Sequence, residues 1–181
     1  MAAGGDDSAG DLALRPLTRA DFPVLTRWLA QPHVAQWWGV PMTAEGLESE
    51  FGPCVDGTDP TFVFVAEERG EAVGLAQYYR LAHNPEYAQA VEVENGAGID
   101  LLIGRADRCG QGLGPRMIRA VLAEVWDRYP GVDCAMAGPS VENTRSHRAF
   151  EKAGFRPARQ VSVPGEVEDE LIFVCSRPTA G

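Results

Sequence analysis

The sequence predicts an α/β fold in one domain, and three observations support this expectation. The length of 181 residues is typical of a single domain. Short runs of β-branched, aromatic and aliphatic residues alternate with segments in which apolar residues recur at helical spacing. The resulting order of elements is β-α-α-β-β-β-α-β-α-β-β, without internal repeats.

The start of the chain is predicted to contain one strand and two helices. Residues 12–17 form the strand. The T-x-x-D capping signature of Thr18 and Asp21 begins a helix that ends near residues 31–33. After a Trp-Trp-Gly loop, a second helix is expected over residues 43–53, capped by its threonine and closed by its Gly-Pro pair.

The middle of the chain is predicted to form three strands. Residues 61–66 and 72–79 flank the turn at residues 68–71, which indicates a hairpin. Residues 83–95 are expected to be a long polar connection, and connections of this length inside compact domains are often functional. The next strand is predicted over residues 97–103.

The last part of the chain contains the clearest helix, over residues 112–128, with its apolar side chains on one face. A strand is predicted over residues 132–137. A further helix is expected over residues 143–152, capped by its asparagine and followed by a glycine stop. Residues 159–163 and 170–175 are predicted to close the sheet as a second hairpin.

Composition and charge exclude several classes of protein. The formal net charge of −10 disfavours nucleic acid and anionic membranes as partners and suits a cationic ligand. No run of 18 apolar residues is present, and the start of the chain lacks the features of a signal peptide. The four cysteines and three histidines are scattered, so we expect reduced thiols, no metal site and a cytoplasmic protein.

A glycine-rich loop lies between the strand at residues 97–103 and the helix at residues 112–128. Glycines allow close approach of the backbone, and free amides at a helix start attract a pyrophosphate. The spacing differs from both the Rossmann fingerprint and the P-loop. An ordinary glycine-rich turn is the alternative. The loop consists of Cys109, Gly110, Gln111, Gly112, Leu113 and Gly114.

Residues 143–155, NTRSHRAFEKAGF, resemble the N-x-x-(A/S)-x-x-x-(Y/F)-x-K-x-G-F signature of GNAT (Gcn5-related) N-acetyltransferases. The segment follows the glycine loop at the distance that this family shows. The resemblance implies a mixed, mostly antiparallel central sheet flanked by helices, over residues 11–177. It leaves residues 1–10 as a disordered tail and 178–181 as a C-terminal tail. It also implies acetyl-CoA as cosubstrate and no metal.

The same resemblance assigns the cofactor contacts. The backbone of residues 109–114 would bind the CoA pyrophosphate. Leu102 and Ile103 would line the pantetheine arm, and Asn143 would donate a hydrogen bond to it. Phe150 would lie on the second CoA helix, where the family commonly has a tyrosine as general acid.

Five segments are similar to the aminoglycoside 6'-N-acetyltransferases, within a resemblance that covers most of residues 12–175. They are LRPL at 14–17, HVAQWWG at 33–39, GLAQYY at 74–79, GID at 98–100 and EKAGF at 151–155. This resemblance implies acetylation of an aminoglycoside 6'-amine and a role in antibiotic resistance. Gly138 stands where those enzymes have an acidic residue that binds the antibiotic. Lysine acetyltransferases of the siderophore type share a related tryptophan loop.

Asp100 is the candidate general base. A carboxylate in the middle of an apolar strand is unusual unless it has a function. It would attract an ammonium group and accept its proton, directly or through water. A buried carboxylate satisfied by backbone donors is the structural alternative. Within the resemblance, a backbone amide near Leu102 would stabilise the oxyanion, where the sheet splays.

Four further residues are candidates for the acceptor site: Trp37, Trp38, Gln77 and Tyr79. Aromatic faces attract cations, and an indole can stack on a sugar ring. Simple core packing is the alternative for the tryptophans. Because they are adjacent, at most one of them is expected to point fully inward.

These observations predict an acetyl-CoA-dependent N-acetyltransferase that acts on a primary amine of a cationic small molecule, as a monomer or homodimer. Two alternatives stay open. The acceptor could be another amine, such as a siderophore or hydroxylysine precursor, a polyamine or a protein N-terminus. The chain could also be a non-catalytic acyl-CoA-binding module.

Overall fold

A computed structural model describes residues 12–39 and 43–178. The predicted tail at residues 1–10 and the last three residues of the chain lie outside this range. Seven strands form one sheet: β1 (Leu12–Pro16), β2 (Phe62–Glu68), β3 (Glu71–Arg80), β4 (Gly96–Ile103), β5 (Cys134–Ala137), β6 (Arg156–Val161) and β7 (Glu170–Ser176).

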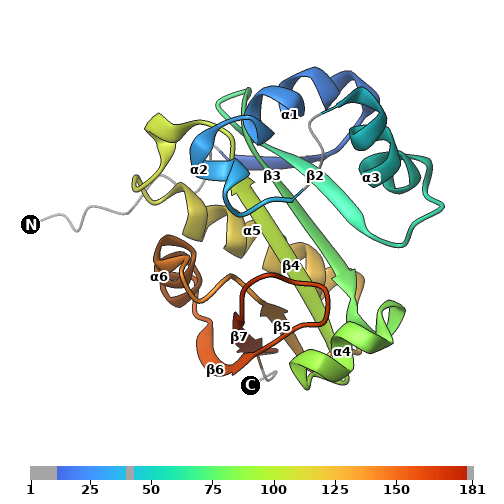
Figure 1. Cartoon of the computed structure of the whole chain (residues 1–181), viewed down its shortest axis with the longest axis vertical. Helices are drawn as coiled ribbons and strands as arrows, with labels where there is room; N and C mark the ends of the chain where they lie inside the picture. Colours follow the sequence, from blue (N-terminus) through green and yellow to red (C-terminus); the bar gives the residue numbers. More distant parts are fainter. Residues whose placement is uncertain (1–11, 40–42, 179–181) are drawn as a thin grey trace, which may run out of the picture.

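The strand order is β1-β2-β3-β4-β5-β7-β6, and every neighbouring pair is antiparallel except β4 and β5. This confirms the predicted mixed, mostly antiparallel sheet. The parallel pairing covers only Gly96 to Gly98 of β4, opposite Cys134 to Met136 of β5. Beyond Gly98, β4 continues to Ile103 paired only with β3 among the described residues, so the sheet opens on its β5 side (Figure 1).

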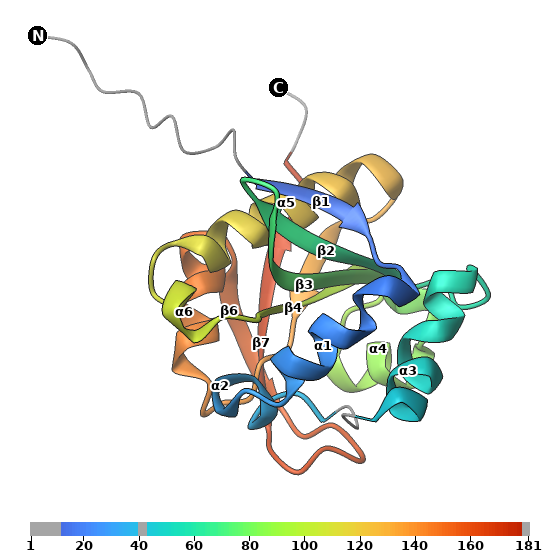
Figure 2. The same cartoon turned by 90° about the horizontal axis from the view of Figure 1, so that it is seen from above.

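Helices cover both faces of the sheet. They are α1 (Phe22–Leu29), α2 (Pro32–Ala35), α3 (Ala44–Asp56), α4 (Pro85–Val91), α5 (Leu113–Arg128) and α6 (Thr144–Lys152). Two views show α5 on one face, and α1 to α4 together with the β6–β7 connection on the other (Figures 1 and 2). No helix in the described residues is long and apolar enough to cross a bilayer.

The alternation of side chains along β4 assigns its residues to the two faces. Ala97 and Ile99 are buried in the cluster that contains the apolar stripe of α5. Leu102 is buried in the opposite cluster, which contains residues of α1 and α3. Asp100 has the same parity as Leu102, so its side chain lies on the face covered by α1 to α4.

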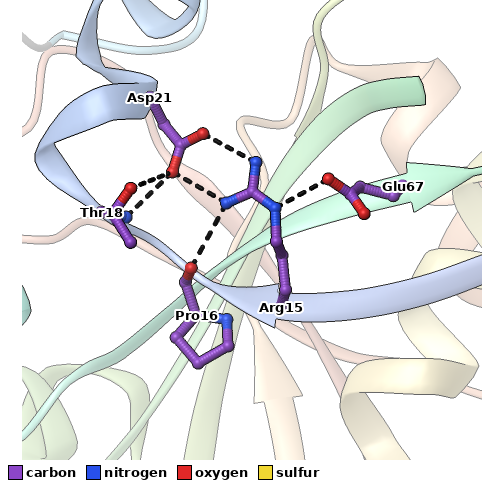
Figure 3. A network of polar contacts seen from close by, with 5 residues as sticks. All are labelled: Arg15, Pro16, Thr18, Asp21 and Glu67. Carbon is purple, nitrogen blue, oxygen red and sulfur yellow. Dashed lines mark hydrogen bonds and ion pairs between the residues drawn. The ribbon is translucent and has the colours of Figure 1, made fainter. Parts of the chain in front are cut away.

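The predicted capping signature is confirmed and belongs to a larger ion-pair network (Figure 3). The Asp21 carboxylate accepts hydrogen bonds from the backbone amide and the hydroxyl of Thr18, both at 2.9 Å. Arg15 of β1 donates to both Asp21 oxygens, at 2.7 and 2.8 Å, and to Glu67 Oε1 of β2 at 2.7 Å. These bonds attach the start of α1 to the sheet edge and hold the pKa of the buried Asp21 near 2.

Helix α1 in turn packs against the end of β4. The indole of Trp28 lies over Gly104, where a Cβ atom would approach it to 2.2 Å. His33 of α2 donates a hydrogen bond from Nε2 to the carbonyl oxygen of Ile103 at 2.8 Å. Trp28 is thus a core residue, and α2 is fixed beside the C-terminal end of β4 (Figure 1).

The structure corrects three predictions. The segment at residues 83–95 is not a plain loop, because Asn84 accepts a hydrogen bond from the Tyr87 amide at 3.3 Å and caps α4. Pro32 begins α2 instead of ending the preceding helix, since proline is well suited to the first turn. Helix α3 continues to Asp56, where Gly57 at φ +71° provides the stop.

Candidate active site

Asp100 and Gln77 form the centre of the candidate active site. They are direct neighbours across the β3–β4 ladder, and Gln77 Nε2 donates a hydrogen bond to Asp100 Oδ2 at 2.9 Å. Burial raises the pKa of Asp100, and the Gln77 hydrogen bond opposes this by favouring the carboxylate. The Asp100 carboxylate has no ion-pair partner among the described residues. It is therefore not half of an ion pair within these residues, and its role as general base stays a prediction.

Tyr79 lies on the same face, two residues beyond Gln77 on β3. Its ring covers Gly98 of β4, where a Cβ atom would approach the ring to 2.4 Å. Burial, with the negative charges of Asp100 and Glu170, raises the pKa of Tyr79 well above its usual value. The hydroxyl thus keeps its proton at neutral pH and shares a hydrogen bond with Tyr87 of α4.

Glu170 is a candidate site residue that the sequence did not indicate. It begins β7, and its Oε2 accepts a hydrogen bond from the Tyr87 hydroxyl at 2.9 Å. Burial, followed by repulsion from Glu166 and Asp100, raises the pKa of Glu170 to about 7. An acidic residue at the head of an apolar strand was the only sequence signal. Its interaction partners, Tyr87 of α4 and Asp100 of β4, are brought to it only by the folding of the chain.

The predicted tryptophan pair follows α2. Trp38 is half-buried and packs against the cluster that includes residues of α1 and α3, whereas Trp37 is 39% exposed. This agrees with the expectation that only one of the two points inward. The polar contacts described above join Gln77 to Asp100 and Tyr79 to Tyr87, and neither tryptophan takes part in them. Roles for Trp37 and Trp38 in acceptor binding therefore stay predictions.

The glycine loop has the backbone shape that its sequence suggests. Gly110 and Gly112 have φ values of +77° and +80°, in the left-handed region that favours glycine. A Cβ atom at either position would meet nothing within 4 Å, so the conformation, not space, requires glycine there. Gly112 is the N-cap of α5, and the loop therefore leads directly into the free amides of a 16-residue helix.

Several contacts fix this loop relative to the sheet. Glu68 of β2 forms ion pairs with Arg108, just before the loop, and with Arg116 in α5. Gln111 Nε2 donates a hydrogen bond to the carbonyl oxygen of Asp107 at 2.6 Å. Buried Leu113 anchors the first turn of α5 in the core. The loop is thus held at both ends while its glycine backbone stays uncovered by side chains.

The remaining predicted cofactor residues lie on β4, α5 and α6. A Cβ atom at Gly114 would lie 3.4 Å from Ala149 of α6 and 3.9 Å from Ile103 of β4. Ile103 and Ala149 thus lie beside the first turn of α5. Leu102 is buried on the face of the sheet that carries Asp100. Asn143 caps α6, with its Oδ1 accepting from the Ser146 amide at 3.1 Å.

Phe150 occupies the position on α6 where the resemblance expects a tyrosine. Its side chain is 3% exposed and packs against Phe155 and Phe173, with ring centroids 5.1 and 6.1 Å away. These contacts account for Phe150 as a core residue. Its predicted contact with the cofactor stays a prediction.

No group of three or more His, Cys, Asp or Glu residues suited to a metal ion occurs within residues 12–39 and 43–178. The four cysteines are all free.

Comparison with known proteins extends this picture. The family model of the acetyltransferase (GNAT) domain matches residues 18–163. The aminoglycoside N(6')-acetyltransferase type 1 of Klebsiella pneumoniae is 32% identical over 162 residues, which are 87% of this chain and 80% of that protein. The lysine N-acyltransferase MbtK of Mycobacterium sp. (strain MCS) is 24% identical over 81% of this chain and 60% of that protein.

Solved structures give the same relationship. The aminoglycoside acetyltransferase AAC(6')-Ib in complex with coenzyme A and kanamycin superposes with a TM-score of 0.76 and 29% identity, covering 92% of this chain and 95% of that chain. A structure of AAC(6')-Ib with paromomycin and acetyl-CoA has the same TM-score of 0.76, over 92% of this chain and 94% of that one. The family model and these relatives together show that the chain belongs to the GNAT family of acetyltransferases.

Proposed function

We propose that this chain transfers the acetyl group of acetyl-CoA to a primary amine of a cationic aminoglycoside, at the 6' position. The observation that carries the proposal is the Asp100 carboxylate, which is held by Gln77 and has no basic partner among the described residues. It lies on the face of β4 where the sheet opens beyond Gly98. The relatives that bind aminoglycosides support the choice of acceptor.

The glycine loop fits the diphosphate of acetyl-CoA. Gly110 and Gly112 keep the backbone uncovered, and the first amides of α5 lack helical partners. Acetyl-CoA supplies a thioester carbonyl that is open to attack by an amine. Leu102 and Ile103 end β4 beside this loop, so they would line the arm that leads from the diphosphate to the acceptor.

Asp100 would carry out the proton transfer. An amine like that of lysine has a reference pKa near 10.4, so it arrives as an ammonium ion at neutral pH. The carboxylate attracts this ion and accepts its proton, directly or through one water. The neutral nitrogen can then attack. A backbone amide of β4 near Leu102, where the strand has no β5 partner, would donate to the oxyanion.

No tyrosine is needed at position 150 for this chemistry. A thiol has a reference pKa near 8.5, so its release as thiolate at pH 7 costs only about 2 kcal/mol. Tyr79 keeps its proton at neutral pH and lies on the Asp100 face, so its hydroxyl would be a donor once it gives up its hydrogen bond with Tyr87. Water is the other available donor.

The test is a free-thiol turnover assay with a panel of acceptors from kanamycin-like polyamino sugars to polyamines and lysine derivatives. Asp100→Asn keeps the shape of the side chain and removes its charge. We expect kcat/KM to fall about 10²–10⁴-fold while affinity for acetyl-CoA stays unchanged. Glu124→Gln is the matched control, because Glu124 is exposed on α5, which covers the other face.

Each alternative predicts a different result. Near-normal turnover by Asp100→Asn would make Asp100 a structural residue. A preference for lysine derivatives or polyamines over polyamino sugars would replace the aminoglycoside proposal with acylation of another amine. Release of no free thiol with any amine would indicate an acyl-CoA-binding module.

A further inference from the structure

A second carboxylate faces the site of Asp100. Glu170 has the same parity on β7 as Ile172, which is buried in a cluster with residues of α4. The opposite face of β7 is marked by Phe173, which is buried with α5. Glu170 therefore lies on the face that carries Asp100 and Tyr79.

Gly138 provides the space for this carboxylate. It follows β5, next to the strand on which Glu170 lies. A Cβ atom at position 138 would stand 2.1 Å from Glu170 Oε2 and 2.9 Å from the Tyr87 hydroxyl. Any other residue at position 138 would displace the carboxylate or the tyrosine. The Glu170 carboxylate can therefore occupy this position only because Gly138 has no side chain.

Polar contacts hold one oxygen of Glu170 and leave the other available. Oε2 accepts the hydrogen bond from Tyr87, whose own hydroxyl is connected to Tyr79. Oε1 has no hydrogen-bond donor within the described ranges. Asp100 shows the same pattern, because Gln77 holds Oδ2 and no described residue donates to Oδ1.

Neither carboxylate has a basic partner in the part of the chain that the structure describes. Half-buried carboxylates are usually paired with a cation, because burial without one is costly. Here a second acidic group lies nearby instead, and Asp100 contributes to the raised pKa of Glu170. A ligand with two positive groups would supply the missing charge at both places.

We propose that Glu170 binds a second ammonium group of the acceptor, beside the amine that Asp100 deprotonates. This inference rests on the proposed function and deepens it, since it names the residue that binds a second amine of the acceptor. The carboxylates of Asp100 and Glu170 and the hydroxyls of Tyr79 and Tyr87 are polar groups that a polyamino sugar would contact. Glu170 is then a specificity-determining residue. Gly138 leaves the space for its carboxylate, and Tyr87 donates a hydrogen bond to it.

The proposal also predicts how acceptor binding depends on pH. The groups that face Glu170 are Tyr87 of α4, Tyr79 of β3, Asp100 of β4 and Glu166 of the β6–β7 connection. The two tyrosines stay neutral in the working range, because burial raises the pKa of each. Since the pKa of Glu170 is about 7, its charge and its hold on a cation increase as pH rises from 6 to 8.

The experiment compares two acceptors, a kanamycin-type polyamino sugar and the single-amine sugar 6-amino-6-deoxyglucose. With the polyamino sugar, we expect Glu170→Gln to raise KM about 10–100-fold, the range for a lost charged contact. With the single-amine sugar, KM should change less than about 3-fold, because that acceptor has no second ammonium group. Calorimetry of the polyamino sugar with the CoA-bound protein should show the same loss of affinity. Glu124→Gln is again the control for net charge.

A swap of the carboxylate makes the test independent of how one variant folds. Glu170→Ala removes the acid and frees the space over Gly138. Adding Gly138→Asp to that variant returns a carboxylate to this space from β5. We expect Glu170→Ala alone to lose affinity for the polyamino sugar and the double variant to recover most of it.

The possible failures are distinguishable. Unchanged affinity for the polyamino sugar in Glu170→Gln and Glu170→Ala would overturn this inference and leave the proposed function intact. An equal loss for both sugars would make Glu170 a residue that positions Tyr79 and Asp100, which also overturns it. If the wild-type protein neither binds nor acetylates the polyamino sugar while acetylating another amine, the proposed function fails together with the inference.

Discussion

Gln77 and Asp100 face each other across β3 and β4, and Gln77 Nε2 donates a 2.9 Å hydrogen bond to Asp100 Oδ2. Two opposing effects act on the carboxylate. Burial raises its pKa, and the amide donor lowers it by stabilising the charged form. In the proposed mechanism, the Gln77 hydrogen bond therefore extends to lower pH the range in which Asp100 can accept a proton.

Replacing Gln77 with Met should shift the activity of the enzyme to higher pH. Met keeps the length of the side chain and removes the donor, so the pKa of Asp100 rises further. A general base works only when deprotonated, so the acid limb of the kcat/KM profile should move to higher pH. The measurement is this profile with the best acceptor. Gln89→Met, at an exposed position of α4, is the control. An acid limb that does not shift in Gln77→Met would show that Gln77 does not affect the proton transfer.

Replacing Gly112 with Val should abolish binding of acetyl-CoA while the fold survives. Gly112 has a φ of +80°, and a β-branched residue there must change the backbone of the loop, at a cost of about 1–3 kcal/mol. Gly57→Val is the matched control, because Gly57 has a φ of +71° with equally open surroundings at the end of α3. Calorimetry should show lost CoA affinity only in the first variant. Equal affinity in both would remove the loop from the cofactor site.

Phe150→Tyr should keep activity and extend it to lower pH, because the added hydroxyl can protonate the leaving thiolate. This holds if that hydroxyl reaches the cofactor side of α6. Phe155→Tyr is the control, since Phe155 is 2% exposed in the same cluster, and a buried hydroxyl without a partner costs about 1–3 kcal/mol. Thermal unfolding and turnover are measured for both. A large loss of turnover in a folded Phe150→Tyr protein would show that Phe150 serves only in core packing and does not face the cofactor.

Asp21→Asn should lower stability near neutral pH by about 2 kcal/mol, the range for charge-assisted hydrogen bonds to a buried carboxylate. Arg15 holds the pKa of Asp21 near 2, below its ordinary value of 3.8. A depressed carboxyl pKa contributes stability that is complete above the unfolded value and disappears as pH falls through about 2. The difference in unfolding free energy between the two proteins should therefore shrink between pH 4 and pH 2.

The control for this prediction is the exposed pair of Arg19 and Asp56. Solvent screens that pair, so Asp56→Asn should change stability much less than Asp21→Asn does. Denaturant unfolding at several pH values measures both variants. Equal effects would mean that burial of Asp21 adds nothing to its ion pair.

The parts of this protein that the sequence predicted well depend on local rules. Helix α5 and its glycine loop were evident because a 3.6-residue apolar period and left-handed glycines act within one segment. Helix α4 was missed because its polar sequence has little periodicity. Its Asn84 cap is local, but the burial of Val91 against Leu81 and Ile172 depends on the folded chain.

The candidate site divides in the same way. Asp100 could be identified from the sequence alone, because a charge among apolar residues of one strand is a local anomaly. At Gly138, the sequence showed only that the acidic residue of the similar aminoglycoside acetyltransferases is absent. The tertiary structure decided what fills its space, because the antiparallel pairing of β5 with β7 brings Glu170 there and α4 brings Tyr87. Periodicity places a side chain on a face, but only the packing of distant strands and helices determines which charges meet.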